Sequence, residues 1–254
     1  MGDPVIDAAR KALGPVGVTL PVSFTEPLDM PRQRAAVVRL ERLGYRAVWT
    51  NEVVGGKDAL VQLAVLLAAT ESMTFGTSIA NIWTRAPETM HGAASVLAQA
   101  FPDRFVLGLG VGYKEQAAVA GREFGSPLAT IRDFVARMDN QTQPPAPTVP
   151  YPRIIAANGP KMLAQAGEIA DGALPAGVAP GFTAKARETL GPDKLLVVGL
   201  QVLRDDLMDA ASIAAAIQAH LAAGADHVDL LPPVGVEFGA AIDRFAEFAS
   251  VLVR

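Results

Sequence analysis

The run from Ala156 to Lys161, AANGPK, combines residue types that can hold a phosphate group. A predicted buried strand ends here and a helix begins at once, with proline at the first helical position. The unpaired backbone N–H groups of Gly159, Lys161 and Met162 would point at an anion, and glycine lets the backbone approach it. An ordinary helix start, in which Asn158 caps its own first turn, explains the same residues equally well.

A second run, Gly108-Leu109-Gly110-Val111-Gly112, ends another predicted strand with alternating glycines. Its spacing is GxGxG, whereas dinucleotide-binding turns have GxGxxG, and Asn158 stands where such a fold would place an acidic residue. Gly110 and Gly112 either clear space for a flat ring or a phosphate tail, or let the strand pack tightly at a rim. Both interpretations stay open.

Two side chains near strand ends are candidates for acid-base chemistry: Glu52, which closes the second strand, and His91, in the first turn of a helix. Tyr113, in the loop after the glycine run, could form an aromatic surface for a substrate or be an ordinary rim residue. A carboxylate at a strand end can act as a base or bind a cofactor, and it can equally be a solvated loop acid. His91 can reach a pocket mouth or simply cap and pack. His220 and His227 flank a later helix away from the expected active end and receive no role.

The loops after the third and fourth predicted strands carry Trp83 and Arg85. Binding residues concentrate on loops held by a rigid scaffold, where an aromatic surface and a cation can contact a substrate. Our hypothesis is that Trp83 and Arg85 contact substrate, and ordinary rim residues explain them equally well.

Composition excludes several classes of function. A net charge of −4, without a run of Lys or Arg, gives no footprint for nucleic acid or an anionic membrane. The chain has no cysteine and its three histidines lack metal-ligand spacing, so we predict no metal site. The first residues lack an apolar signal core, and no apolar run approaches the roughly 20 residues of a membrane span. We expect a cytoplasmic protein with small-molecule partners.

Short apolar runs alternate with segments of helical spacing along the whole chain. The runs lack polar alternation, as expected for parallel strands buried on both faces. Eight strand-helix units predict a (β/α)8 TIM barrel with its active-site loops at one end, and an open doubly wound sheet is the alternative. The predicted strands are Val16 to Leu20, Ala47 to Thr50, Thr74 to Ala80, Phe105 to Leu109, Arg153 to Ala157, Gly172 to Leu174, Leu195 to Val202 and His227 to Leu231.

The helices carry their own signals. Apolar spacing is clearest over Met90 to Phe101 and over Ala241 to Leu252, and Ser126-Pro127 and Gly159-Pro160 mark helix starts. Residues 140–152, NQTQPPAPTVPYP, are too rich in proline for a core element and predict an extended surface connector between the half-barrels. We expect one domain over residues 1–254.

Four stretches of the chain resemble the luciferase-like flavin and deazaflavin oxidoreductases, and within them the actinobacterial branch of coenzyme F420-dependent oxidoreductases. They are LERLGYRAVWTNE (40–52), FGTSIANIW (75–83), the helix with DRFVLGLGVGY (103–113), and IIAANGPKMLAQAGEIADGAL (154–174). The resemblance spans nearly the whole chain. It implies a luciferase-like barrel, a homodimer, and F420 or FMN as cofactor.

The resemblance also implies site residues. A bulged third strand would carry a non-prolyl cis peptide at Ser78-Ile79, backing the isoalloxazine-type ring, with Glu52, Ser78, Ile79 and Asn81 near that ring. The phosphate would lie on the backbone of Asn158, Gly159 and Lys161, and Ala176 and Gly177 would complete this end. The implied chemistry is hydride transfer at the deazaflavin C5, with an acid or base from the protein.

Two departures from the family pattern matter. The sugar-phosphate dehydrogenases of the superfamily have a histidine after the acidic residue of the second strand, and here Val53 follows Glu52. Proton transfer would then fall to Glu52, His91, Tyr113 or a water molecule. Many relatives also have a longer insertion between the fourth helix and the fifth strand, where this chain has only the proline connector.

Three rival functions remain from the sequence. The nearest is an FMN-dependent monooxygenase, because backbone-dominated binding barely distinguishes flavin from deazaflavin. A non-catalytic F420- or flavin-binding protein is the second, since Val53 replaces the usual histidine. A phosphate-binding lyase or isomerase is the third, and it lacks the expected lysine at a strand end.

Overall fold

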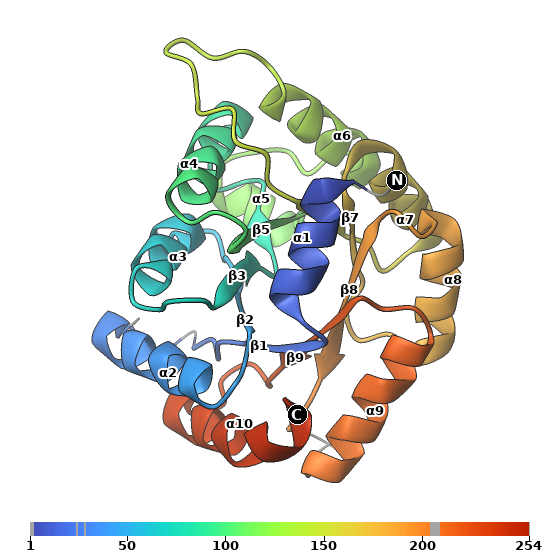
Figure 1. The fold of residues 1–254 in the computed structure, drawn as a ribbon. Helices are drawn as coiled ribbons and strands as arrows, with labels where there is room; N and C mark the ends of the chain where they lie inside the picture. Colours follow the sequence, from blue (N-terminus) through green and yellow to red (C-terminus); the bar gives the residue numbers. More distant parts are fainter. Residues whose placement is uncertain (1–2, 24, 28, 204–208, 254) are drawn as a thin grey trace.

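The computed structural model describes residues 3–23, 25–27, 29–203 and 209–253 (Figure 1). All of its strands run parallel and join one sheet in the order β3-β2-β1-β9-β8-β7-β6-β5-β4, and a further pairing of β3 with β5 closes the sheet into a barrel. The strands are β1 (Val16–Thr19), β2 (Ala47–Thr50), β3 (Thr74–Thr77), β4 (Ala80–Asn81), β5 (Phe105–Gly110), β6 (Arg153–Ala156), β7 (Gly172–Leu174), β8 (Leu195–Gln201) and β9 (His227–Leu231).

Strands β3 and β4 are two pieces of the predicted strand Thr74 to Ala80, so the nine strands make an eight-stranded (β/α)8 barrel. Gly76 pairs with Val106 and Ala80 pairs with Leu109, which leaves one extra residue on the third strand. This is a β-bulge. The Ser78-Ile79 peptide within it is cis, which confirms the expectation from the resemblance.

Helices surround the barrel, and their apolar faces pack on the outward-facing side chains of the strands in one continuous core. Both strongly periodic helices were predicted correctly, as were the starts at Ser126-Pro127 and Gly159-Pro160. The helices are α1 (Pro4–Leu13), α2 (Met30–Arg42), α3 (Ala59–Leu67), α4 (Pro87–Ala100), α5 (Lys114–Val119), α6 (Pro127–Met138), α7 (Pro160–Ile169), α8 (Pro180–Leu190), α9 (Ala210–Ala222) and α10 (Phe238–Leu252).

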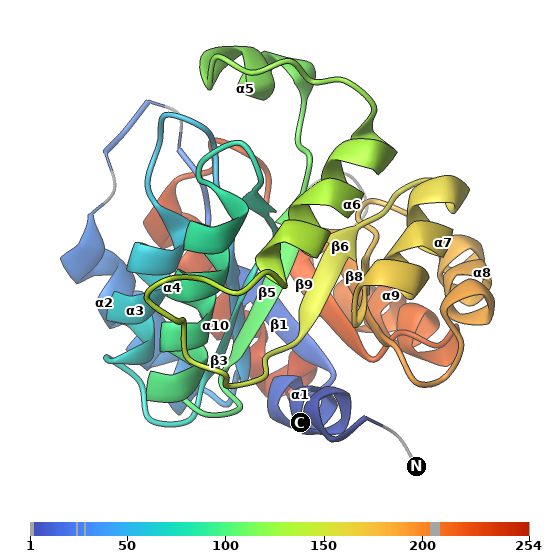
Figure 2. The same ribbon diagram turned by 90° about the horizontal axis from the view of Figure 1, so that it is seen from above.

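Helix α1 closes the amino end of the barrel (Figure 2). Its buried residues Ile6, Ala9 and Leu13 join a second core cluster inside the barrel, which includes Trp49. No element was predicted here, although Asp3 caps the helix by accepting from the N–H of Val5 at 2.9 Å and the buried residues have helical spacing. The amphipathic face of α1 is buried because the barrel offers it an apolar opening.

The segment between α6 and β6 has neither helix nor strand, as predicted for the proline-rich connector of residues 140–152. It crosses from the end of α6 to the start of β6 as a loop that projects from the body in Figure 1. Within the described ranges, no helix is long and apolar enough to cross a membrane.

Candidate functional site

The carboxyl ends of the strands lie opposite α1, where barrel enzymes place their active sites (Figure 2). Loops after β1, β2 and β9 enclose a cavity of about 540 Å³ at this end. The bulge after β3 lies next to the loop after β2, because the N–H of Glu52 donates to the carbonyl oxygen of Ile79 at 3.0 Å.

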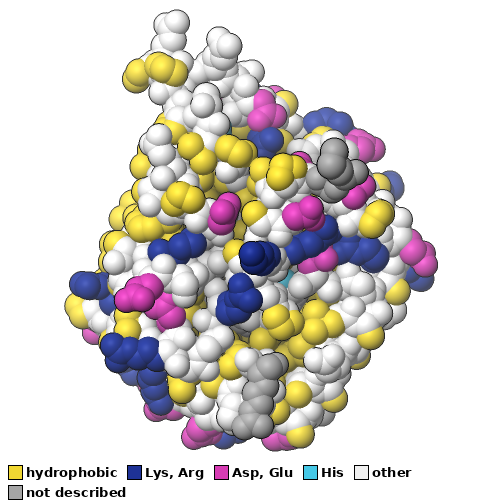
Figure 3. All heavy atoms as spheres, viewed as in Figure 1, with side chains coloured by type: hydrophobic (Ala, Val, Ile, Leu, Met, Phe, Trp, Pro, Cys, Tyr) yellow, Lys and Arg dark blue, Asp and Glu magenta, His cyan; other side chains and the backbone are white. Residues whose placement is uncertain are grey.

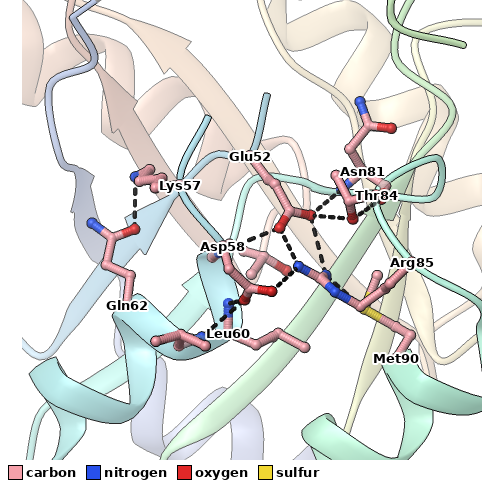
Figure 4. Close-up of polar contacts among 12 residues, drawn as sticks. Glu52, Lys57, Asp58, Leu60, Gln62, Asn81, Thr84, Arg85 and Met90 are labelled. Atoms are coloured by element: carbon pink, nitrogen blue, oxygen red, sulfur yellow. Dashed lines mark hydrogen bonds and ion pairs between the residues drawn. The ribbon is translucent and has the colours of Figure 1, made fainter. Parts of the chain in front are cut away.

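Glu52 is buried, with 3% of its surface exposed, and its carboxylate is fully engaged (Figure 4). It accepts from the N–H groups of Ala59 at 3.1 Å and Asn81 at 2.9 Å, and from the hydroxyl of Thr84 at 3.1 Å. The guanidinium of Arg85 contacts both carboxylate oxygens, with Nη1 at 3.2 Å from Oε2. Of the two interpretations of Glu52, the solvated loop acid is therefore wrong. The carboxylate instead fastens the loops after β2 and β4 to each other.

Arg85 forms ion pairs with two carboxylates, those of Glu52 and Asp58. Its Nη2 also lies 2.8 Å from Oδ2 of Asp58, the residue that caps α3 by accepting from the N–H groups of Leu60 and Val61. A guanidinium between two carboxylates that also form backbone hydrogen bonds is held in place. Arg85 thus shields the Glu52 charge, and the structure gives it this role whether or not it touches substrate.

Asn81 connects the bulge to the glycine run. Its amide nitrogen donates to Oε1 of Gln116 at 2.9 Å, and its amide oxygen accepts from the N–H of Trp83 at 3.0 Å. The Trp83 indole N–H donates to the carbonyl oxygen of Val111 at 2.7 Å. Tyr113 begins α5 with its side chain 73% exposed, and its N–H donates to Gln116 at 3.0 Å. Asn81, which contacts Glu52 directly, is thus linked to Trp83 by a hydrogen bond and to the backbone of Tyr113 through Gln116.

The glycines of the run make room for protein atoms. A Cβ on Gly108 would lie 2.0 Å from the carbonyl oxygen of Thr77, and one on Gly110 would lie 2.8 Å from Ile79. Gly112 has a φ of +54°, and a Cβ there would lie 1.9 Å from Gln116. These contacts support the tight-packing interpretation, in which the glycines accommodate the bulge and the turn into α5.

The second group of predicted residues gathers across the rim, at the starts of α7 and α8. Asn158 does not cap its own helix: its Oδ1 accepts from the N–H of Ala176 at 2.8 Å and so joins the loops after β6 and β7. Gly159 is the N-cap of α7, which has no side-chain cap bond among the described residues, and a Cβ on it would meet none of their atoms within 4 Å. Lys161 is exposed in the first turn, and Gly177 follows Ala176 with a φ of +65°.

His91 lies apart from both groups. Its Nδ1 is 2.8 Å from the hydroxyl of Tyr151, in the connector, and its ring also contacts Ser95 of its own helix at 3.4 Å. Burial lowers the pKa of His91, and the nearby Arg153 lowers it further. The structure therefore packs His91 between α4 and the connector.

Two titratable side chains with shifted pKa values, the buried Asp229 and the half-buried Lys57, went unnoticed in the sequence. Burial raises the pKa of Asp229 to about 7 inside the barrel, although hydrogen bonds from Thr19, at 2.8 Å, and Ser78 act against this. Burial lowers the pKa of Lys57 to about 8, with Glu52 acting in the opposite direction. An acid within the apolar run HVDLL could have signalled Asp229, whereas nothing around Lys57 in GGKD signals burial. Among the described residues, no group of histidines and acids could hold a metal ion.

The sequence profile of the luciferase-like monooxygenase family matches residues 16–191, more than half of the chain. The chain belongs to this family. The match begins at β1, includes the bulge, and ends just after α8, so it covers both groups of candidate residues described above.

The curated relatives of this chain include proteins named as F420-dependent enzymes or their homologues. The chain is 27% identical over 151 residues to a 5,10-methylenetetrahydromethanopterin reductase of Methanolobus tindarius, covering 53% of this chain and 46% of that protein. It is 29% identical over 178 residues to a Mycobacterium tuberculosis protein assigned as a coenzyme F420-dependent oxidoreductase, covering 57% and 51%. The chain spans about half the length of these curated relatives.

A solved structure shows the same luciferase-like fold over nearly the whole chain. An F420-dependent secondary alcohol dehydrogenase, in complex with an F420–acetone adduct, superposes with a TM-score of 0.75 at 16% identity. The likeness covers 93% of this chain and 98% of that one, and it establishes the barrel architecture.

Proposed function

We propose that this chain is an F420-dependent oxidoreductase that transfers a hydride between the deazaflavin and an organic substrate. The observation that carries the proposal is the start of α7, where unpaired N–H groups meet open space at the carboxyl end of the barrel. The F420 enzymes among the relatives support the choice of cofactor. When bound, the deazaflavin would supply the hydride acceptor or donor.

Asn158, Gly159, Lys161, Ala176 and Gly177 would hold the cofactor's phosphate. The N–H groups at the start of α7 are aligned with the helix dipole, so a phosphate there would gain both hydrogen bonds and a favourable field. The bond from Ala176 to Asn158 fixes the two loops relative to each other before any ligand binds. The residues present therefore fit a phosphate group.

The ring end would be built by the bulge and the residues that hold it. Ser78 and Ile79 lie at the bulge, and Glu52 fixes it through its backbone bond to Ile79 and its carboxylate bond to Asn81. Because hydrogen bonds occupy both oxygens of Glu52, we give this residue a positioning role and look for the proton carrier elsewhere. Gly110 and Gly112 would contribute by admitting Ile79 and Gln116.

Fluorescence titration with F420 and, separately, FMN tests the proposal. We expect saturable binding of F420 at micromolar concentration or tighter, with weaker binding of FMN. Gly159→Asp should strengthen the α7 cap yet repel the phosphate, because Gly159 has room for a side chain and an extended backbone conformation. Gly159→Asn is the matched uncharged control.

We expect Gly159→Asp to unfold at a higher temperature than wild type while binding F420 at least ~10-fold more weakly, since a charge at this site is worth about 1–2 kcal/mol. Gly159→Asn should bind more tightly than Gly159→Asp. Equal F420 affinity in wild type, Gly159→Asp and Gly159→Asn would show that the phosphate does not bind at the start of α7.

The family name favours one alternative, an FMN-dependent monooxygenase. Tight FMN binding with oxygen consumption by the reduced protein would establish that function in place of F420 chemistry. Tight binding of either cofactor without turnover would instead indicate a carrier protein.

We further propose that the protein is a homodimer. Val61 on α3 and Val96 on α4 expose 64% and 54% of their surface, and Figure 3 shows hydrophobic side chains gathered on the side where these helices lie. Exposed apolar patches commonly mark protein interfaces. Sedimentation of wild type against the double variant Val61→Asp/Val96→Asp should show a dimer that becomes a monomer.

A further inference from the structure

The cavity at the carboxyl end is lined by Asn51 and Lys57, which belong to neither of the two residue groups described above. Its described wall is about half apolar and half polar, and it carries more carboxylates than cations. Such a wall disfavours an anionic ligand. The apolar wall residues are Pro21, Val22, Pro27, Val53, Val54, Val236 and Phe238.

Lys57 lines this cavity, and neutral atoms hold its ammonium group. Its Nζ donates to the hydroxyl of Thr50 at 2.5 Å and to Oε1 of Gln62 at 2.6 Å (Figure 4). The charged group that acts on it is Glu52, which already binds Arg85. A buried amine whose hydrogen-bond partners are neutral readily gives up its proton, and its pKa of about 8 agrees with this environment.

Asn51 also lines the cavity, next to the bulge. Its Oδ1 is buried without a hydrogen-bond partner among the described residues. A buried acceptor without a donor is costly, so a ligand that supplies one gains affinity. The neighbouring Glu52 is bonded to Ile79, which places this wall of the cavity against the proposed ring support.

We propose that this cavity binds the organic substrate, a neutral molecule that combines an apolar part with a hydroxyl or carbonyl group and a second hydrogen-bond donor, and that Lys57 carries the proton. The inference rests on the proposed function, which supplies the hydride partner. Asn51 would accept from the second donor, and Lys57 would contact the reacting oxygen.

The proton and the hydride leave the substrate together in the direction of oxidation. The O–H bond of the alcohol breaks and its proton forms an N–H bond with the neutral amine of Lys57, while the hydride of the carbinol carbon goes to the oxidised deazaflavin. A C=O bond forms, and Lys57 releases the proton to solvent. Reduction of a carbonyl group runs through the same atoms in reverse, with Lys57 as the acid.

Nuclear magnetic resonance tests the cavity without any cofactor. Protein labelled with ¹³C-lysine is titrated with alkali, and the Lys57 signal is assigned by its absence from Lys57→Met. We expect the pKa of Lys57 to be about 8, well below the ordinary value of a lysine. We also expect its signal to shift with trans-1,2-cyclohexanediol and with cyclohexanol, but not with cyclohexanecarboxylate.

Asn51→Ala tests how much the ligand's second hydrogen-bond donor contributes to affinity, separately from the ligand's apolar contacts. The diol should bind wild type about 5-fold more tightly than cyclohexanol, the value of roughly one hydrogen bond, and Asn51→Ala should lose this preference. The inference would be overturned if Lys57 had the ordinary lysine pKa of 10.5, or if its signal did not shift with either alcohol.

Lys57→Met and Lys57→Arg then test the proton step in the F420-loaded protein with the same diol. Both variants should bind F420 as wild type does and lower kcat at least ~100-fold, because general acid-base catalysis is worth that much. Unchanged kcat would refute the role of Lys57. Failure of wild type to bind F420 would refute the proposed function alone, since the cofactor-free titration still decides whether the cavity binds alcohols.

Discussion

His227 and Asp229 lie two residues apart on β9 and point to the same side of the strand, into the barrel. His227 bonds Trp49 of β2, and Asp229 bonds Thr19 of β1 and Ser78 at the bulge, so both side chains reach across the interior. Burial lowers the pKa of His227 to about 4 and raises that of Asp229 to about 7. Burial favours the neutral form of each, but their surroundings differ.

At the closed end, both nitrogens of His227 have fixed roles. The indole N–H of Trp49 can only donate, so Nε2 accepts at 3.0 Å, and Nδ1 then donates to the carbonyl oxygen of Gly14 at 2.7 Å. Protonation would set two donors against each other. Asp229, one layer nearer the open end, accepts hydrogen bonds that suit its charged form, although burial raises its pKa to about 7. The closed end thus fixes the neutral form of His227. The pKa of Asp229, about 7, means that its neutral and charged forms have similar free energies near neutral pH.

Truncation of the aromatic side chain at the closed end should have the largest effect. Trp49→Ala removes a fully buried ring that lies against Gly76, and we expect a loss of about 3–5 kcal/mol in the free energy of unfolding. Trp83→Ala, at the open end, is the matched variant and should cost less. Urea unfolding of both measures the difference, and a larger loss in Trp83→Ala would contradict the contrast.

Removal of Arg85 tests whether the open end also contains a rigid part. Arg85→Met leaves the buried carboxylate of Glu52 without a cation and should cost about 3 kcal/mol in the free energy of unfolding. The double variant Glu52→Gln/Arg85→Met should recover part of that loss, as measured by urea unfolding. Additive losses would show that the two side chains stabilise the protein independently.

The pH dependence of stability should separate the two residues on β9. Between about pH 4 and 7 the folded state keeps the proton of Asp229 while the unfolded state releases it, so this residue lowers the free energy of unfolding as pH rises. Between about pH 4 and 6.5 the unfolded state binds a proton at His227 that the folded state refuses, so this residue raises the free energy of unfolding as pH rises. In wild type the two slopes oppose each other.

A variant that lacks one of the two residues should show the pH dependence contributed by the other. We expect the free energy of unfolding to change by about 1.4 kcal/mol per pH unit. Asp229→Asn should lose stability on acidification from pH 6.5 to 4, and His227→Gln should gain it over the same range. Urea unfolding at several pH values measures both. If Asp229→Asn kept the profile of wild type, the carboxyl group would already be ionised in the folded protein at pH 4.

The smallest effects should come from the two buried side-chain oxygens that lack a partner among the described residues, Thr74 Oγ1 near the closed end and Asn51 Oδ1 near the open end. Thr74→Val removes an unsatisfied hydroxyl at nearly constant volume and should raise stability by about 1 kcal/mol. Asn51→Ala should change stability by less than about 0.5 kcal/mol while altering alcohol binding. Thermal unfolding of both variants, with diol titration, checks the pair.

Local signals in the sequence were enough for most of the fold. Apolar runs of strand length placed all eight strands, and proline after Ser126 or Gly159 marked helix starts, because both patterns record the geometry of a few neighbouring residues. The bulge was implied by resemblance, since nothing in TSIAN requires an extra residue on the third strand. The role of Gly108 in that bulge needed the position of Thr77 on the neighbouring strand.

The sequence by itself determined the alternation of strands and helices, the residues at the carboxyl ends of the strands, and the absence of cysteine chemistry. Only the tertiary structure decided that Glu52 is neutralised by Arg85, that Lys57 is buried among neutral partners, and that Asp229 meets Ser78 across the barrel. These features depend on burial and on contacts between residues far apart in the chain. Closure of the barrel creates both, and no local pattern of residue types encodes them.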